Sequence, residues 1–276
     1  MVSLVFAGCS AAVESDRTQC VTDQDCGARG KVFAGSKCVA NLCVSPNSES
    51  VGPWACLGDV IWPGATAGSS HNVSIVVADI ITGKPVPGLA MQVCYKLDIT
   101  CQTPLLPNLV SDAEGRVSFA VPSGFDGFME STGPEAFPFS YFFYPPVTAD
   151  REIPNVPVLQ PAAMTLFSSL VGVELMPDRG HILARVYNCQ GKTAEGVRYT
   201  TSAGDGWTVP FYMLAGIPST RQSATDSAGS GGLLNVPAGS ATVIGNIGDN
   251  GQTLGKPESV VVRAGKITYT AVVPSP

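Results

Sequence analysis

The chain has 276 residues, which is room for about two domains of ordinary size. Hydrophobic residues make up 45% and charged residues only 14%, and 30 glycines and 22 prolines recur in short clusters. This composition favours many short strands joined by turns over long helices. The net charge of −6, with no basic run, argues against nucleic acid and anionic lipid headgroups as partners. No segment has the ~18 uninterrupted apolar residues of a membrane span.

The chain opens with an apolar stretch that ends in small residues directly before a cysteine, Ala7-Gly8-Cys9. This resembles the end of a bacterial lipoprotein signal, in which the cysteine thiol receives diacylglycerol. The resemblance implies an exported protein with Cys9 as the lipid attachment site, and Ser10 implies sorting to the outer membrane, on its periplasmic or its outer side. The alternative is an apolar tail with an unpaired thiol.

The chain contains nine cysteines, and the odd count sets one of them, Cys9, apart. Zinc is disfavoured, because no Cys-x2-Cys pair occurs and His71 and His181 are the only histidines. In an exported protein such a set indicates disulfides. The cysteines expected to be bonded are Cys20, Cys26, Cys38, Cys43, Cys56, Cys94, Cys101 and Cys189.

Residues 10–50 contain few large apolar side chains and cannot build a hydrophobic core. Their four cysteines allow three pairings, between which the sequence does not choose. We expect a disulfide-stapled stalk that holds the body off the membrane, with a recognition module as the alternative.

Two further disulfides are predicted in the body. A bend at Asp98 brings Cys94 and Cys101 within the ~5.5–6 Å Cα separation that a bridge prefers. Cys56 and Cys189 are then left, and we expect them to join the two domains. The alternative is that they pair into the stalk.

The most specific internal signal is a repeat, in which a Gly-Lys-x3-Gly turn, an Asp-x-x-Gly turn and a Val-Pro-x-Gly segment occur twice in the same order. The aspartate accepts hydrogen bonds from its own backbone and the glycine tolerates positive φ, which indicates hairpin turns. A calcium loop would need further oxygen ligands at alternate positions. The repeated positions are Gly83, Gly88, Asp112, Gly115, Pro122 and Gly124, and then Gly191, Gly196, Asp226, Gly229, Pro237 and Gly239.

From Cys56 onward these motifs resemble the carboxypeptidase regulatory-like, transthyretin-like family. The resemblance implies an all-β fold of two tandem Greek-key β-sandwiches with seven strands each, and extends to outer-membrane lipoproteins that carry such domains. We expect a signal remnant over 1–9, a Cys-rich stalk over 10–50, a first β-sandwich over 51–158, a linker helix over 159–178 and a second β-sandwich over 179–276.

Two segments show clear periodicity. Met164, Phe167 and Val171 recur at helical spacing after Pro161 and before Gly172, which predicts a helix packed at the domain junction. The last strand alternates, so that one set of side chains should face inward and the threonines outward. The inward set is Ile267, Tyr269, Ala271 and Val273, and the outward set is Thr268 and Thr270.

Aromatic residues give the best indication of binding. The segment 137–144 places aromatic rings on both faces of a strand, one for the core and the other for a ligand platform or the domain interface. Trp207, Phe211 and Tyr212 are candidate ligand contacts, with core packing favoured for each because aromatic rings dominate sandwich interiors.

The sequence contains no nucleophile elbow and no zinc-protease helix, so no catalytic, cofactor-binding or metal-binding residue is assigned. We expect a non-catalytic, lipid-anchored cell-envelope protein whose sandwiches bind a glycan or a protein, or space another element. The alternative is a secreted hydrolase with distant carboxylates brought together, or a self-cross-linking adhesin with a lysine isopeptide bond. Lys84 and Lys192 fall in predicted loops, which disfavours them for that bond.

Overall fold

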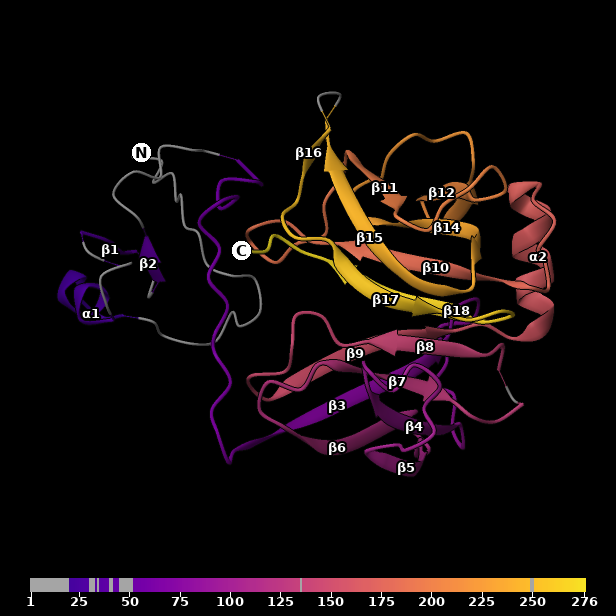
Figure 1. Ribbon diagram of the computed structural model, residues 1–276, viewed down its shortest axis with the longest axis horizontal. Helices are drawn as coiled ribbons and strands as arrows, with labels where there is room; N and C mark the ends of the chain where they lie inside the picture. Colours follow the sequence, from indigo (N-terminus) through magenta and orange to yellow (C-terminus); the bar gives the residue numbers. More distant parts are fainter. Residues whose placement is uncertain are drawn as a thin grey trace.

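The computed structural model describes residues 20–29, 33, 35–39, 42–44, 52–134, 136–248 and 251–276, so the predicted lipid site at Cys9 lies outside the described residues. The described chain is all-β with two short helices. Figure 1 shows two β-sandwiches packed against each other, a helix at one end of them, and a small N-terminal unit to their side.

The N-terminal unit consists of helix α1 (Asp23–Ala28) and strands β1 (Lys37–Val39) and β2 (Leu42–Val44). Asp25 closes the first turn of α1 by accepting the backbone N–H of Thr22 at 2.7 Å. Of the three pairings that the sequence leaves open, the structure has Cys20–Cys38 and Cys26–Cys43, with Cα separations of 5.7 and 5.4 Å. Cystines form most of its hydrophobic cluster, as expected for a segment without a core of its own.

The strands divide into two halves around helix α2 (Pro161–Val171). The first half contains β3 (Ser70–Asp79), β4 (Ala90–Tyr95), β5 (Leu106–Val110), β6 (Arg116–Pro122), β7 (Gly127–Ser131), β8 (Phe139–Phe142) and β9 (Arg151–Val158). The second half contains β10 (Arg179–Val186), β11 (Val197–Thr201), β12 (Val209–Leu214), β13 (Ile217–Ser219), β14 (Ser230–Pro237), β15 (Gly239–Ile247), β16 (Gln252–Thr253), β17 (Glu258–Val262) and β18 (Ile267–Val272).

One sheet runs through both halves. Its nine strands lie in the order β13-β12-β14-β10-β18-β8-β7-β4-β5, and β18 pairs in parallel with β10 on one side and with β8 on the other. The β6-β3-β9 sheet covers this long sheet in the first half. In the second half the cover is β11 and β15, with β16 and β17 paired to successive parts of β15.

The sequence repeat is a repeat of local structure. The backbone N–H of Val77 on β3 donates to the carbonyl of Gly115 at 2.8 Å, and that of Val186 on β10 donates to the carbonyl of Gly229 at the same distance. Both glycines have positive φ, and a Cβ on either would lie within 2.6 Å of the facing valine carbonyl oxygen. Glycine is therefore required at both turns by sterics as well as by φ.

Helix α2 has the start and the end that its periodicity predicted, and it fills only part of the linker expected over 159–178. Pro161 begins it, and Gly172 ends it in the left-handed conformation with φ 67°. Met164 packs in the core of the first half, whereas Phe167 and Val171 pack with residues of β12 and β14 in the second. The helix therefore lies at the junction, as its periodicity predicted.

The two hydrophobic cores exchange side chains between the halves. Ile267 and Tyr269, from the last strand, belong to the core of the first half. Phe128 and Phe142, from β7 and β8, belong to the core of the second half and stack at 5.1 Å between ring centroids. The far face of the aromatic segment 137–144 is thus the interface between the halves, one of the two places that the sequence suggested for it.

The prediction that Thr268 and Thr270 face outward was wrong. Both are buried, together with the neighbouring Ile267, Tyr269 and Val272. The alternation of apolar and polar residues along a strand predicts which side chains are buried only when one face of the strand is exposed to solvent. Strand β18 lies in the middle of the nine-stranded sheet, where both faces are covered, and Thr268 satisfies its hydroxyl by donating to the carbonyl of Val261 at 3.0 Å.

Because the halves share cores, we expect them to unfold together. Ile267→Ala removes a buried side chain and should destabilise the oxidised protein by about 2–5 kcal/mol. Urea unfolding followed by circular dichroism and by tryptophan fluorescence should shift to the same lower midpoint. Ile81→Ala, at an exposed isoleucine, should change the free energy of unfolding by less than about 0.5 kcal/mol. Two separate transitions would contradict the shared cores.

Candidate functional site

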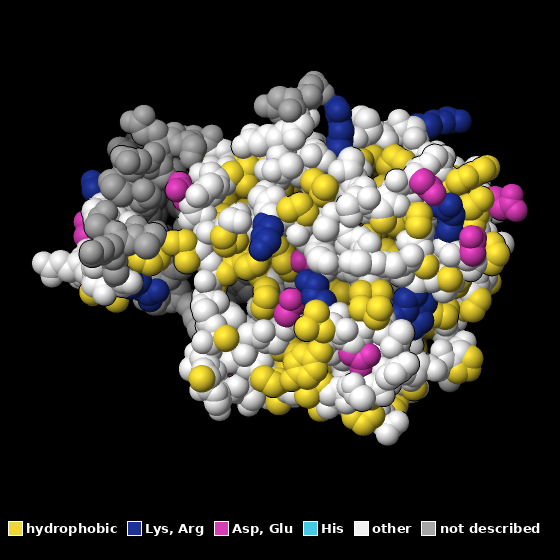
Figure 2. Space-filling model, in the orientation of Figure 1, with side chains coloured by type: hydrophobic (Ala, Val, Ile, Leu, Met, Phe, Trp, Pro, Cys, Tyr) yellow, Lys and Arg dark blue, Asp and Glu magenta, His cyan; other side chains and the backbone are white. Residues whose placement is uncertain are grey.

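The seam between the two halves holds a disulfide and two clusters of charged side chains. Figure 2 shows acidic and basic side chains lying next to each other along this boundary, surrounded by hydrophobic ones. Cys56 and Cys189, 133 residues apart, form a disulfide with a Cα separation of 5.7 Å. Cys189 lies just beyond β10, and its backbone N–H donates to the carbonyl of Pro53. This bond ties the segment before the first half to the second half.

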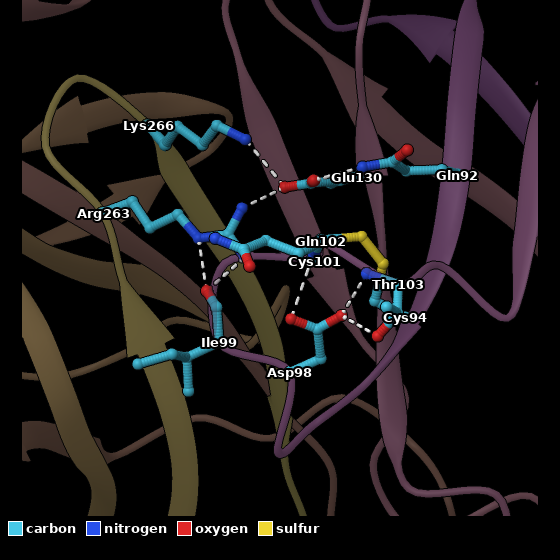
Figure 3. Close-up of a disulfide and its surroundings, with 10 residues drawn as sticks. All are labelled: Gln92, Cys94, Asp98, Ile99, Cys101, Gln102, Thr103, Glu130, Arg263 and Lys266. Atoms are coloured by element: carbon cyan, nitrogen blue, oxygen red, sulfur yellow. Dashed lines mark hydrogen bonds and ion pairs between the residues drawn. A yellow bond between two sulfur atoms is a disulfide. The ribbon is translucent and has the colours of Figure 1, made fainter.

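Glu130 on β7 is a buried carboxylate at the seam (Figure 3). Its Oε2 accepts from Lys266 Nζ at 2.7 Å and from the guanidinium of Arg263, both from the second half. Its Oε1 accepts from the side-chain amide of Gln92 at 2.8 Å. The guanidinium of Arg263 lies 5.2 Å above the ring of Phe128. Removal of this carboxylate would leave two cations facing each other at the seam, so the cluster fixes the register of the halves.

A second charged cluster joins the halves through Lys96. Its Nζ lies 3.1 Å from Oε1 of Glu258 on β17 and 3.3 Å from Oδ1 of Asp126, which precedes β7. Burial raises the pKa of Glu258 to about 8, although the ammonium of Lys96 opposes the shift. At neutral pH Glu258 is therefore mostly protonated, and its contact with Lys96 is a hydrogen bond more than an ion pair.

The disulfide Cys94–Cys101 closes the loop that follows β4, with a Cα separation of 5.6 Å. Figure 3 shows Asp98 inside the closed loop and the side chain of Ile99 directed away from Arg263. The carboxylate of Asp98 accepts from the backbone N–H of Thr103 at 2.8 Å and of Gln102 at 3.0 Å, and these bonds lower its pKa. Both body disulfides join the cysteines that the sequence paired.

The structure separates the three candidate ligand contacts. Phe211 is fully buried and packs edge-on against Phe167 of α2. Tyr212 is buried as well, stacks on Tyr199 and accepts the backbone N–H of that residue through its hydroxyl oxygen. Both therefore belong to the core, which was the favoured expectation, and neither is accessible as a ligand contact. Trp207 is 62% exposed and remains accessible to a ligand.

Trp207 is presented by an ordered turn. Asp205 accepts the backbone N–H of Trp207 at 3.0 Å and forms two hydrogen bonds of 2.8 Å with the guanidinium of Arg179. Those bonds lower the pKa of Asp205 to about 2. The indole is thus held on a fixed backbone, which reduces the conformational entropy lost when a ligand stacks on it.

The two histidines lie in different environments. His181 on β10 is buried, its Nδ1 accepts the backbone N–H of Asn235 at 3.3 Å, and burial lowers its pKa to about 4. His71 on β3 lies 3.8 Å from Asp150, which is exposed. The sulfur atoms of Cys20, Cys26 and Cys43 lie within 4.8 Å of one another, but all three are in disulfides and offer no thiolate to a metal.

None of Glu130, Arg263, Lys266, Lys96 and Glu258 was singled out from the sequence. Each is an isolated charged residue without a motif. The residues that pair with each other are far apart in sequence, and only Arg263 and Lys266, which both contact Glu130, are close neighbours. One signal was available, because charged residues are only 14% of the chain and Glu130 directly follows Phe128 and Met129. A rare charge in a strand is a candidate buried charge, but its partner cannot be named without the pairing of the halves.

The raised pKa of Glu258 predicts a pH dependence. The folded protein holds this proton to about pH 8, whereas the unfolded chain releases it near pH 4.5. The contribution of Glu258 to the free energy of unfolding is therefore complete below pH 4.5. It is lost as the pH rises to about 8, at no more than about 1.4 kcal/mol per pH unit. Urea unfolding of Glu258→Gln should lack this slope, while Glu152→Gln, at an exposed glutamate, should keep it. Equal slopes in all three proteins would contradict the assignment.

Within the described chain no helix is long and apolar enough to cross a bilayer. No protein-family model matches the sequence, and no curated protein matches it. Solved structures with some likeness include the TIE protein of Bacillus anthracis, with 12% identity and a TM-score of 0.27. Others are the shaft pilin SpaA of Lactobacillus rhamnosus GG, with 12% and 0.26, and the major pilin subunit BcpA of Bacillus cereus, with 9% and 0.27.

Each of these matches covers 75% of this chain, and 34%, 99% and 100% of the three proteins in the same order. The chain therefore spans about a third of the length of the TIE protein. TM-scores of this size mean that the chains do not superpose as whole folds. The likeness is one of β-rich architecture, and it carries no inference about the function of this protein.

Proposed function

We propose that this protein is a non-catalytic, lipid-anchored component of the cell envelope, in which two fused sandwiches form a rigid body that spaces or presents a binding surface. The observation that carries the proposal is the joining of the halves by backbone, core and covalent bond at once. Strand β18 pairs with both halves, their cores exchange side chains, and Cys56–Cys189 ties the segment just before the first half to the second half. In such a body the two halves keep a fixed position relative to each other.

The four disulfides support export. Bonds of this kind persist in oxidising compartments and are rare in the reducing cytosol. Two of them order a short N-terminal unit that has no other core, and each closes a loop of 17 or 18 residues, which in the chain-entropy model stabilises it by about 3 kcal/mol. A stapled stalk of this kind suits a body held at a distance from a lipid anchor at Cys9.

The finer assignment is a tandem pair of transthyretin-like, carboxypeptidase regulatory-like domains in an outer-membrane lipoprotein. The matched turns at Gly115 and Gly229 support it, as does the like placement of β3 and β10 between an antiparallel and a parallel neighbour. Trp207 on its fixed turn is the candidate contact for a glycan or a protein, because an exposed indole offers a flat face to a sugar ring.

The anchor is tested by Cys9→Ser in a protein expressed with a complete export signal. Without the thiol no diacylglycerol can be attached, so the variant should move from the membrane fraction to the soluble fraction and lose its partition into detergent. Ser10→Ala keeps the thiol and is the matched control, which should stay with the membrane. Retention of Cys9→Ser in the membrane would reject lipid attachment at this residue.

A second candidate function is self-cross-linking, and the Lys96 cluster favours it. The amine of Lys96 lies between the carboxyl groups of Asp126 and Glu258, at 3.3 and 3.1 Å. Glu258 is buried and mostly protonated at neutral pH, so it is able to donate a proton. Lys84 and Lys192 are exposed, which agrees with the expectation that loop positions disfavour them for an isopeptide bond.

The reaction would join Lys96 Nζ to Asp126 Cγ. The ammonium of Lys96 first passes one proton to the Asp126 carboxylate. The resulting amine attacks Asp126 Cγ while Glu258 protonates the hydroxyl that leaves as water, and Glu258 then recovers a proton from the attacking nitrogen. One C–N bond forms, one C–O bond breaks and one water is released, with no oxidant or reductant. The amide would link the loop after β4 to the start of β7, beside the seam with the second half.

Intact mass spectrometry of the fully reduced, denatured protein tests the bond. The mass should be one water below that of the sequence, and peptide mapping should find the segments around Lys96 and Asp126 joined. Lys96→Arg should have the full mass, and Lys84→Arg should keep the deficit. A wild-type protein of full mass would mean that the cluster is ionic and hydrogen-bonded only.

A further inference from the structure

The disulfide-closed loop after β4 exposes apolar side chains and withdraws its charged ones. Leu97 is 93% exposed, Ile99 55% and Tyr95 44%. Between them, Lys96 turns to Glu258 and Asp126, and Asp98 turns to the backbone of its own loop. Single exposed apolar residues are common on protein surfaces. Three in one short loop, with Lys96 paired to two carboxyl groups and the Asp98 carboxylate hydrogen-bonded to its own loop, form an apolar projection, which we name the 95–99 finger.

The finger is held from several directions. The disulfide Cys94–Cys101 closes its base, and the backbone N–H of Lys96 donates to the carbonyl of Asp126 at 3.1 Å. Arg263, from the second half, donates through Nε to the carbonyl of Ile99 at 2.9 Å (Figure 3). The same guanidinium contacts Glu130, so the charged seam and the finger are one connected unit. The loop is therefore ordered before any ligand binds.

The size of the finger decides between two kinds of partner. Three side chains expose at most a few hundred Å², whereas a stable protein interface buries at least about 1,200 Å². A lipid bilayer has no such minimum, because each side chain that enters it adds its own transfer free energy. The aromatic ring of Tyr95 lies at the base of the finger, and tyrosine is enriched at the depth of lipid headgroups.

Charge decides which bilayer is favoured. The chain carries a net charge of −6, and the only cation of the finger, Lys96, is turned inward and paired. An anionic surface would repel the protein and find no cation on the finger to bind. A zwitterionic surface has no such penalty.

We propose that the 95–99 finger inserts Leu97 and Ile99 into the interfacial region of a zwitterionic lipid bilayer, as a membrane contact separate from the N-terminal lipid. One such contact binds weakly when free in solution, but it sets the orientation of a body that is already tethered. The inference goes beyond the proposed function and does not depend on it, because the contact is measurable in a protein that lacks the lipid.

The test is vesicle flotation of the full chain carrying Cys9→Ser, in its oxidised form. The protein should float with phosphatidylcholine vesicles at high lipid concentration, and added salt should not release it, because the contact is apolar. Adding Leu97→Ser should lower the partition coefficient by about tenfold. Ile81→Ser makes a like change at an isoleucine that is 64% exposed in another loop, and should leave the partition coefficient unchanged. Both sites are on the surface, so circular dichroism should show that both variants are folded.

A second measurement reports depth directly. Leu97→Trp keeps a large apolar side chain at the tip, so its fluorescence should shift to shorter wavelength when phosphatidylcholine vesicles are added. Three results would overturn the proposal: no flotation of the parent protein, an equal loss for Ile81→Ser, or binding to phosphatidylglycerol vesicles alone that salt abolishes. Self-association of the parent in sedimentation experiments that Leu97→Ser removes would assign the finger to a second copy of the chain and would overturn it as well.

Discussion

Strand β18 pairs in parallel with β10 on one side and with β8 on the other, and both of its faces are covered. The remaining features of the body follow from this placement. Because the strand joins two sheets into one, the halves must meet in a single register, and the side chains of β7 and β8 fall within reach of β17 and β18. Aromatic residues fill the apolar part of the contact, and the charged residues of the seam close its margin.

The seam also shows why polar groups are tolerated there. Glu130 is buried but meets two cations and an amide, so its oxygens have partners that compensate for lost water. Glu258 is equally buried but meets one ammonium beside a second carboxylate, and burial raises its pKa to about 8. The same residue type thus meets two electrostatic environments within one interface, which differ in the number of cations that face it. A fixed register is what keeps these environments distinct.

Much of the local structure was predictable, since it depends on neighbours in sequence. The turns ending at Gly115 and Gly229, the helix from Pro161 to Val171 and the closed loop at Cys94 are all set by short spacings. The pairing Cys56–Cys189 followed by elimination. The joining of the two halves was not predictable, because nothing local in β18 distinguishes a strand with one covered face from a strand with two. Its threonines were therefore placed on the wrong side, and the charged partners, which depend on the same joining, were missed.

The position of β18 has a consequence for synthesis and export. It is the last strand of the described chain, yet it occupies the centre of the largest sheet. While the chain emerges from a ribosome or a translocation pore, β8 can pair with β7 but presents its other edge to solvent until residues 267–272 arrive. An open strand edge beside a hydrophobic face is a template for pairing with other chains. The first half therefore depends on the end of the second for protection, and a chain that is stalled or cut before residue 267 would be prone to aggregate although most of its strands are already present.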